Sequence, residues 1–254
     1  MRSVLAMALV TAILPGWIVR AETVPADAMD PLEIIRRSDD LLRRGESFAR
    51  LTMVIERPDW TRTVVMDAWT QGASNVLTRV LSPKKEKGVT FLKRGREAWQ
   101  FVPSIDRTIK IPPSMMLQSW MGSDFTNDDV VRADSIVTDY THEITDEVTE
   151  DGFDYWMITS TPKPGAPVVW GKIVFKIRKQ NYVPDRADYF DEDGERIKYY
   201  QAFDIRPIED LEVATRFTMY DLTRPGYQTT LQYDNMSFSP EIRKGTFSLR
   251  NLKR

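Results

Sequence analysis

Apolar and polar residues alternate along most of the chain from Ser47 onward, in short segments separated by turn residues. A period of two is typical of antiparallel strands joined by hairpins. The last segment contains a turn at Pro225-Gly226, and we expect about eleven strands in all. The sequence therefore predicts a mainly β protein with few helices. The expected strands lie near residues 47–57, 61–71, 74–82, 88–93, 96–102, 106–111, 136–148, 153–160, 168–178, 183–191, 195–205 and 212–234.

One helix is expected before the strands, at residues 31–44. Asp30 can cap it, Pro31 suits its first position, and Gly45 ends it. Its apolar residues fall at helical spacing and make one stripe, so the helix must pack on an apolar surface. These residues are Leu32, Ile34, Ile35, Leu41 and Leu42.

The alternation has one long interruption, residues 112–132, which we call the lid segment. Two prolines end the preceding strand, and we expect a short helix from Ser114 to Met121 that stops at Gly122. A second short helix is expected at residues 126–132, because Thr126 and the acid three positions later fit a capping box. Gly122-Ser123-Asp124 would then join the two helices.

A long antiparallel sheet must twist and curl, and its concave face has to be filled by side chains, helices or a ligand. Helices are scarce here, so we expect a cavity between the sheet and the few helices that cover it. Methionines suit such a place because their side chains adapt to changing apolar neighbours. The alternative is that the same residues cover an ordinary core, and the alternation does not tell which strand face points inward. The candidate lining residues are Met53, Trp69, Phe91, Trp99, Phe101, Met115, Met116, Leu117, Trp120, Met121 and Phe125.

The first twenty-one residues resemble a secretory signal peptide. Arg2 precedes an uncharged apolar run from Val4 to Leu14, and Val19-Arg20-Ala21 offers small residues for cleavage after about Ala21. An uncleaved anchor is the alternative, although the run is shorter than the roughly 20 residues of a spanning helix. No later stretch is long enough either, so we expect an exported protein that is not integral to a membrane. We therefore expect one mature domain over residues 22–254.

Composition narrows the classes of partner and site. The chain has no cysteine, which excludes disulfides, thiolate metal sites, a cysteine nucleophile and a lipid-modified N-terminal cysteine. Its 35 basic and 37 acidic residues are interspersed, so there is no broad basic patch for nucleic acid. No phosphate loop, dinucleotide fingerprint or paired metal-ligand spacing is present, so we predict no cofactor and no metal.

Candidate catalytic chemistry is sparse. His142 is the only histidine, and no Gly-x-Ser-x-Gly elbow is present to expose a serine. We therefore predict a surface histidine on a strand and no catalytic residue. Asp191 to Glu195 fails the calcium-loop pattern and is predicted to be a hairpin turn. Asp128 and its acidic neighbours are better explained by capping than by a metal cluster.

The sequence resembles the LolA-like periplasmic proteins, in particular the outer-membrane lipoprotein-sorting branch. The resemblance lies in "SPKKEKG", "WQFVPS" and "MGSDFTNDD", within a stretch that runs from Leu81 to Val130. It implies an unclosed β-barrel of about eleven strands around a hydrophobic cavity, with helices at the open side. It also implies a monomeric, non-enzymatic carrier of lipid or lipoprotein acyl chains, served by an inner-membrane transporter or ABC-type permease. The length and lid depart from the best-known carrier, so that protein's lid contacts are not transferred.

Two other functions remain open from the residues alone. One is a lipid hydrolase that uses Ser123, Asp124 and His142 at the apolar mouth. The other is a structural interaction module with a filled interior.

Overall fold

Thirteen strands form one antiparallel sheet in the computed structural model, which describes residues 29–43, 45–131 and 135–253. The expected signal peptide lies outside the described residues. The mainly β, unclosed architecture with few short helices is confirmed. The strands are β1 (Glu46–Arg57), β2 (Trp60–Gln71), β3 (Asn75–Ser82), β4 (Thr90–Arg94), β5 (Glu97–Val102), β6 (Arg107–Lys110), β7 (Tyr140–Glu150), β8 (Phe153–Pro162), β9 (Lys172–Arg178), β10 (Pro184–Phe190), β11 (Arg196–Ile208), β12 (Leu211–Asp221) and β13 (Gln228–Ser237).

Each of the twelve predicted segments overlaps a strand, and the last, residues 212–234, holds two strands, β12 and β13, separated by the expected turn. The total of thirteen exceeds the expected number of about eleven. The turn chemistry is as expected. Between β10 and β11, the Asp191 carboxylate accepts hydrogen bonds from the backbone nitrogens of Asp193 at 3.0 Å and Glu195 at 2.9 Å. Gly194 adopts a φ of 84°, which a residue without Cβ takes without strain.

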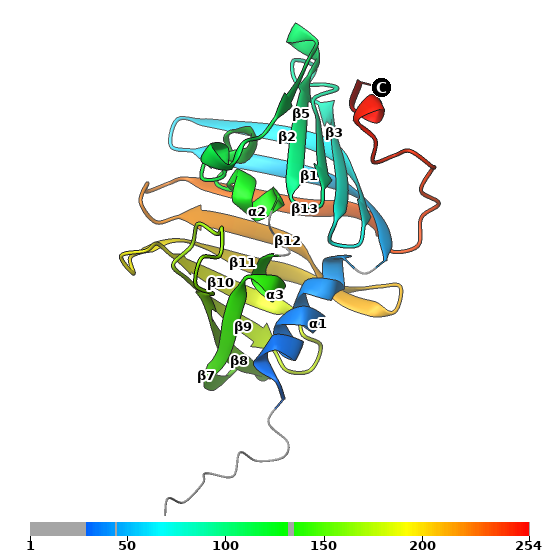
Figure 1. Cartoon of the computed structure of the whole chain (residues 1–254). Helices are drawn as coiled ribbons and strands as arrows, with labels where there is room; N and C mark the ends of the chain where they lie inside the picture. Colours follow the sequence, from blue (N-terminus) through cyan, green and yellow to red (C-terminus); the bar gives the residue numbers. More distant parts are fainter. Residues whose placement is uncertain (1–28, 44, 132–134, 254) are drawn as a thin grey trace, which may run out of the picture.

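The pairing of β1 with β13 sets the topology. β1 lies between β2 and β13, so the strands follow the order β6-β5-β4-β3-β2-β1-β13-β12-β11-β10-β9-β8-β7. Consecutive strands β6 and β7 therefore stand at opposite edges of the sheet. The chain between them has to cross the open side, which is where Figure 1 shows the green helical segments in front of the sheet.

The first helix forms as predicted and covers the β7–β12 half. α1 spans Pro31–Arg43, and the Asp30 carboxylate accepts a hydrogen bond from the Leu32 nitrogen at 3.0 Å. Two residues of this helix, Ile34 and Ile35, are buried. Figure 1 shows α1 running beside the short helix α3 (Ser135–Thr138).

Helix α3 replaces the first residues of the strand predicted at 136–148. Ile136 and Val137 pack against the cluster that contains Ile34 and Ile35, so contact with α1 overrides their preference for a strand. The strand β7 then begins at Tyr140.

The helix expected at residues 114–121 does not form. The structure has two single 3₁₀ turns there, η2 (Pro113–Met115) and η3 (Trp120–Gly122). The carbonyl oxygens of Met116 and Gln118 instead accept hydrogen bonds from the nitrogens of Asp128 at 3.0 Å and Asn127 at 2.9 Å. Since those carbonyls bind the start of the next helix, they cannot support a regular helix of their own.

The second lid helix is confirmed as α2 (Asn127–Val131). Its capping box is reciprocal. The Thr126 nitrogen donates to Asp129 Oδ2 at 2.7 Å, and the Asp129 nitrogen donates to Thr126 Oγ1 at 3.2 Å.

The sheet buries apolar residues on both faces of its β1–β5 half. The inner cluster combines strand residues with Met116, Trp120 and Val131 of the lid segment. The outer cluster of Leu77, Leu92 and Phe101 is covered by Leu252 of the 3₁₀ helix η4 (Leu249–Lys253). Figure 1 shows this C-terminal segment beside β3 and β5.

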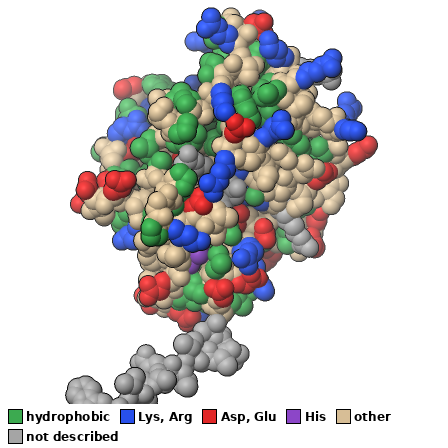
Figure 2. Space-filling model, in the orientation of Figure 1, with side chains coloured by type: hydrophobic (Ala, Val, Ile, Leu, Met, Phe, Trp, Pro, Cys, Tyr) green, Lys and Arg blue, Asp and Glu red, His purple; other side chains and the backbone are tan. Residues whose placement is uncertain are grey.

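Surface charge is mixed on the face that carries the helices. Figure 2 shows lysine and arginine side chains mainly toward the top and acidic ones mainly toward the bottom, both separated by neutral and apolar groups. This face has no continuous basic surface of the kind that binds a phosphate backbone.

The outer cluster gives a stability prediction. Leu92 is fully buried, whereas Leu117 is 63% exposed. Leu92→Ala should lower the free energy of unfolding by about 2–5 kcal/mol, because it leaves a cavity in a packed cluster. The matched variant Leu117→Ala should change it by less than about 0.5 kcal/mol. Urea unfolding measures both, and equal effects would mean that the C-terminal segment does not cover β4.

Candidate functional site

A cavity of about 310 Å³ lies between the inner face of β9–β13 and the helices α1, α2 and α3. Most of its surface is apolar. It is lined by Ile35, Ser38, Asp39, Leu42 and Arg43 of α1; by Phe125, Asp128, Asp129, Val130, Ser135 and Ile136 of the covering segment; and by Tyr140, Trp170, Ile173, Phe175, Pro184, Tyr189, Tyr200, Phe217, Met219, Leu231 and Tyr233.

A continuous row of aromatic rings forms the sheet wall of this cavity. Neighbouring ring centroids are 5.3 Å apart from Trp170 to Tyr189 and 6.5 Å apart from Tyr189 to Tyr200. The next two steps, through Phe217 to Tyr233, are each 6.1 Å. Tilted and edge-on contacts at these distances are favourable, so the wall is held by its own packing and stays in place without a ligand.

Polar groups meet the cavity at few points. Asp39 and Arg43 form an ion pair one helical turn apart on α1. The Tyr140 hydroxyl donates to the Trp170 carbonyl at 3.5 Å. Burial raises the pKa of Tyr140 well above its usual range, and nearby Asp128 raises it further, so this hydroxyl stays protonated at neutral pH. The site is therefore apolar with a few fixed hydrogen-bonding groups, as in many small-molecule sites.

Phe125 is the candidate lining residue that reaches this cavity. Met53, Phe91, Met116 and Trp120 are buried together in the inner cluster of the other half. Met115 and Met121 pack against the same cluster. A gap of about 10 Å³ lies between Trp120, Phe91 and the strands. The methionine-rich part of the lid segment thus fills the concave face over β1–β5, and the open volume lies over β9–β13.

Three other candidate residues lie on the opposite face of the sheet. Trp69, Trp99 and Phe101 belong to or pack against the outer cluster. Strand alternation explains this placement, because Phe91 faces inward while its neighbour Leu92, paired with Trp99, faces outward. Leu117 is exposed at the surface of the lid segment.

A groove adjoins the cavity on the other side of Phe125. It has a volume of about 650 Å³ and is lined by lid residues that include Leu117, by the β10–β11 turn, and by Lys198 and Arg224. Phe125 and Trp170 line both the groove and the cavity. These two side chains therefore form the boundary between the cavity and the groove.

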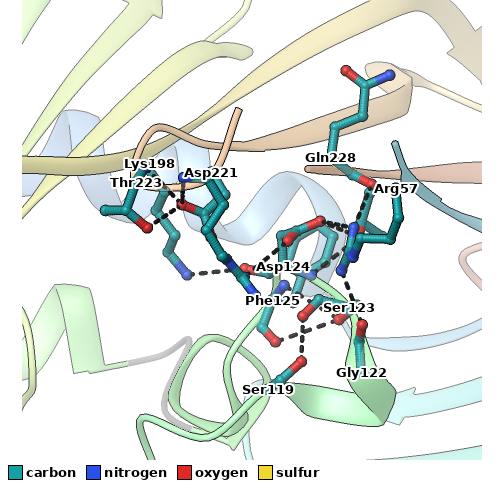
Figure 3. Close-up of polar contacts among 12 residues, drawn as sticks. Arg57, Ser119, Gly122, Ser123, Asp124, Phe125, Lys198, Asp221, Thr223 and Gln228 are labelled. Atoms are coloured by element: carbon teal, nitrogen blue, oxygen red, sulfur yellow. Dashed lines mark hydrogen bonds and ion pairs between the residues drawn. The ribbon is translucent and has the colours of Figure 1, made fainter. Parts of the chain in front are cut away.

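A buried ion pair fastens the lid segment to the sheet (Figure 3). Asp124 accepts a hydrogen bond from Arg57 Nη1 at 2.9 Å, and the two side chains are 1% and 5% exposed. The Thr229 hydroxyl donates to the same carboxylate at 2.7 Å and accepts from the Asp124 nitrogen at 3.0 Å. Arg224 reaches the other carboxylate oxygen at 3.4 Å. We call these four residues the lid anchor.

The anchor also fixes the backbone around it. Arg57 donates to the carbonyl oxygens of Gly122 at 3.0 Å and Gln228 at 3.2 Å, as Figure 3 shows. Arg62 donates to the Met121 carbonyl, and Lys198 pairs with Asp129 of α2. The expected joint at Gly122-Ser123-Asp124 is therefore held by charged side chains from β1, β2 and β11.

Sequence reasoning missed the arginines and the threonine of the anchor. Asp124 stood out as a joint residue, and a buried carboxylate always needs partners. Nothing along the chain indicates that those partners come from positions 57, 224 and 229, because the β1–β13 pairing and the connection between β12 and β13 bring them together.

The anchor yields a second prediction. Asp124→Ala leaves Arg57 buried without its carboxylate and should lower the free energy of unfolding by about 3–5 kcal/mol. Glu97→Ala is the control, because its ion pair with Lys110 is exposed and should contribute less than about 1 kcal/mol. Chemical denaturation measures both. Arg57→Met combined with Asp124→Leu should recover part of the loss, and no recovery would contradict an unpaired buried charge as its cause.

The structure does not bring the hydrolase residues together. His142 Nδ1 lies 2.8 Å from the hydroxyl of Ser160, which is fully buried and closed to a substrate. The Ser123 hydroxyl donates to the Trp120 carbonyl at 2.6 Å. Asp124 is engaged in the lid anchor. His142 lies on the edge strand β7 as predicted, and is half-buried there.

Burial lowers the pKa of His142 below its ordinary value. The unfolded chain, with a histidine pKa near about 6.5, then takes up a proton before the folded chain does. Stability contributed by neutral His142 is therefore complete above that pH and is lost as the pH falls below it. Wild type should lose more unfolding free energy than His142→Gln between pH 7.5 and 5.5 in urea titrations. Equal losses of unfolding free energy in the two proteins would show that other titrating groups determine the stability between pH 7.5 and 5.5.

The described residues contain no group of three or more histidine, cysteine, aspartate or glutamate side chains placed to hold a metal ion. Within them, no helix has the length and apolar character that crossing a membrane requires.

Comparison with known proteins identifies the fold. Residues 72–254 match the model of a family described as "Uncharacterized protein". No curated protein matches the sequence. A DUF1329 family protein from Desulfovibrio piger has a similar structure, with a TM-score of 0.81 at 22% identity over 88% of this chain and 99% of that one.

Two further solved structures agree. A Vibrio parahaemolyticus domain named after outer-membrane lipoprotein sorting gives a TM-score of 0.79 at 20% identity, over 88% of this chain and 98% of that one. A LolA superfamily protein from Nitrosomonas europaea gives 0.75 at 20% identity, over 88% and 100%. The LolA-like fold expected from the sequence is thus confirmed.

Proposed function

Because the chain belongs to the family described as "Uncharacterized protein" and has a LolA-like fold, we propose that it is a periplasmic carrier of acyl chains. It would enclose the chain of a lipid or lipoprotein and move it toward the outer membrane. The observation that carries this proposal is the apolar cavity between the sheet and its covering helices. A structural module would need no such volume.

The size of the cavity sets what it holds in its closed form. A methylene group fills nearly the volume of a water molecule in the liquid, roughly 30 Å³, so about 310 Å³ accommodates on the order of ten such groups. At about 0.8 kcal/mol for each buried methylene, their transfer contributes about 8 kcal/mol. Part of that is offset by the cost of ordering the ligand, which leaves an affinity that permits release.

A longer chain requires displacement of the boundary formed by Phe125 and Trp170. Moving these side chains would join the cavity to the adjacent groove. We propose that the lid segment regulates this opening, with Met115, Met116, Leu117, Trp120 and Met121 offering apolar surface as it moves. The lid anchor would be its fixed end, because Asp124 is held from β1 and β13.

The cellular setting is part of the proposal. Residues 1–21 would act as a signal peptide that is removed on export, and the domain of residues 22–254 would act as a monomer. An inner-membrane transporter or ABC-type permease would load it. The name of the similar Vibrio domain, which refers to outer-membrane lipoprotein sorting, supports this direction of transfer.

A cavity-filling substitution tests the proposal. Leu231 lines the cavity, so Leu231→Trp should lower the affinity for an environment-sensitive fluorescent lipid probe at least about tenfold by occupying the site. Ile109→Trp is the matched control, because Ile109 is 42% exposed on the edge strand β6, and it should bind the probe like wild type. Thermal unfolding checks that each variant is folded.

Organic extraction of the protein purified from its native periplasm should yield acyl species, measured by mass spectrometry. If the protein carries no acyl species and the probe does not bind, the carrier proposal is wrong. If His142→Ala abolishes turnover of an extracted lipid, the protein is instead a hydrolase.

A further inference from the structure

Three tyrosine hydroxyls in the cavity wall have no hydrogen-bond partner within the part of the chain that the structure describes. Tyr189, Tyr200 and Tyr233 all line the cavity, and their hydroxyls make no hydrogen bond to another residue that the structure describes. All three side chains are only partly buried. Tyr140 differs, because its hydroxyl donates to a backbone carbonyl. The three open hydroxyls are therefore available to a ligand.

These hydroxyls act as donors. Burial raises the pKa of Tyr189, Tyr200 and Tyr233 above the usual range of a phenol, so all three remain protonated at neutral pH. A pure hydrocarbon that enters the cavity displaces the water that would solvate them and offers no acceptor in return. A ligand with an oxygen acceptor at their level avoids that cost.

The charges around the cavity restrict which acceptor is suitable. Three lining residues carry a carboxylate, Asp39, Asp128 and Asp129, and one carries a positive charge, Arg43, which also acts on the three tyrosine hydroxyls. Arg43 is paired with Asp39, and Asp129 with Lys198. An anionic ligand would therefore enter a low-dielectric site whose cations are already engaged by carboxylates, which is unfavourable.

Resting on the proposed carrier function, we propose that Tyr189, Tyr200 and Tyr233 select neutral acyl esters over both free fatty acids and plain hydrocarbons. The ester oxygen would accept hydrogen bonds from the tyrosine row while the chain lies along Phe217 and the apolar residues of α1. The ligand class is thus an esterified acyl chain, as in a glycerolipid or the diacylglyceryl group of a lipoprotein.

Three ligands of matched length test this selectivity: methyl decanoate, sodium decanoate and n-undecane. Each displaces an environment-sensitive fluorescent probe from the wild-type protein at pH 7.5. The ester should bind several-fold more tightly than the alkane and more tightly than the carboxylate, because about three- to tenfold is expected from one hydrogen bond. Tyr200→Phe and Tyr189→Phe should each weaken ester binding by about that factor and leave alkane binding unchanged.

Tyr199→Phe is the matched control. Tyr199 precedes Tyr200 on β11 and lies on the other face of the sheet, where it stacks on Tyr220 with ring centroids 4.7 Å apart. Removing the Tyr199 hydroxyl should leave the affinities for the ester, the carboxylate and the alkane at their wild-type values. Since the three cavity hydroxyls bond to none of the described residues, the cavity variants should keep the wild-type melting temperature.

The outcomes separate this proposal from the carrier function. Equal binding of ester and alkane, tighter binding of the carboxylate, or unchanged ester binding in Tyr200→Phe and Tyr189→Phe overturns the selectivity while leaving the carrier function intact. Failure of all three ligands and of the probe to bind overturns the carrier function, and this proposal with it.

Discussion

The antiparallel pairing of β1 with β13 is the constraint on which the rest of the structure depends. It joins the early hairpins to the late ones in one sheet and sends β6 and β7 to opposite edges. The connection between these strands cannot remain a hairpin loop and has to cross the open side. The same pairing brings Arg57 of β1 beside Thr229 of β13, where Asp124 in the middle of that connection meets both. Pairing of distant strands thus creates both the lid segment and its point of attachment.

The two halves of the sheet differ in how their concave faces are filled. Over β1–β5 the lid segment packs Met116 and Trp120 into the concave face and leaves almost no space. Over β9–β13 the covering helices stand above a row of aromatic rings, and the cavity remains between them. In this structure one half is therefore packed by the lid segment, while the other keeps an apolar volume. Phe125 lies where the two arrangements meet, at the wall of the cavity and beside the open groove.

Local sequence patterns predicted the elements whose determinants are local. The alternation located every strand, Asp30 located the start of α1, and Thr126 with Asp129 located α2. The predictions failed where contacts between residues far apart in the chain determine the local structure. The lid residues 114–121 have a helical apolar spacing, but their carbonyls bind the start of α2. Alternation gives two faces without saying which is inner, so Trp69 and Trp99 were assigned to a cavity that lies on the other side. Tyr189, Tyr200 and Tyr233 escaped notice because only the folded sheet aligns them.

The lid anchor also has an evolutionary consequence. Asp124 and Arg57 are both almost fully enclosed, and removing one partner of such a pair costs far more than replacing both by apolar residues of similar size. A lineage that loses the acid is therefore under immediate selection to lose the base, although the two positions are far apart in the chain. Among related sequences these sites are expected to covary, and that covariation would distinguish chains with a fastened cover from those whose cover is attached in another way.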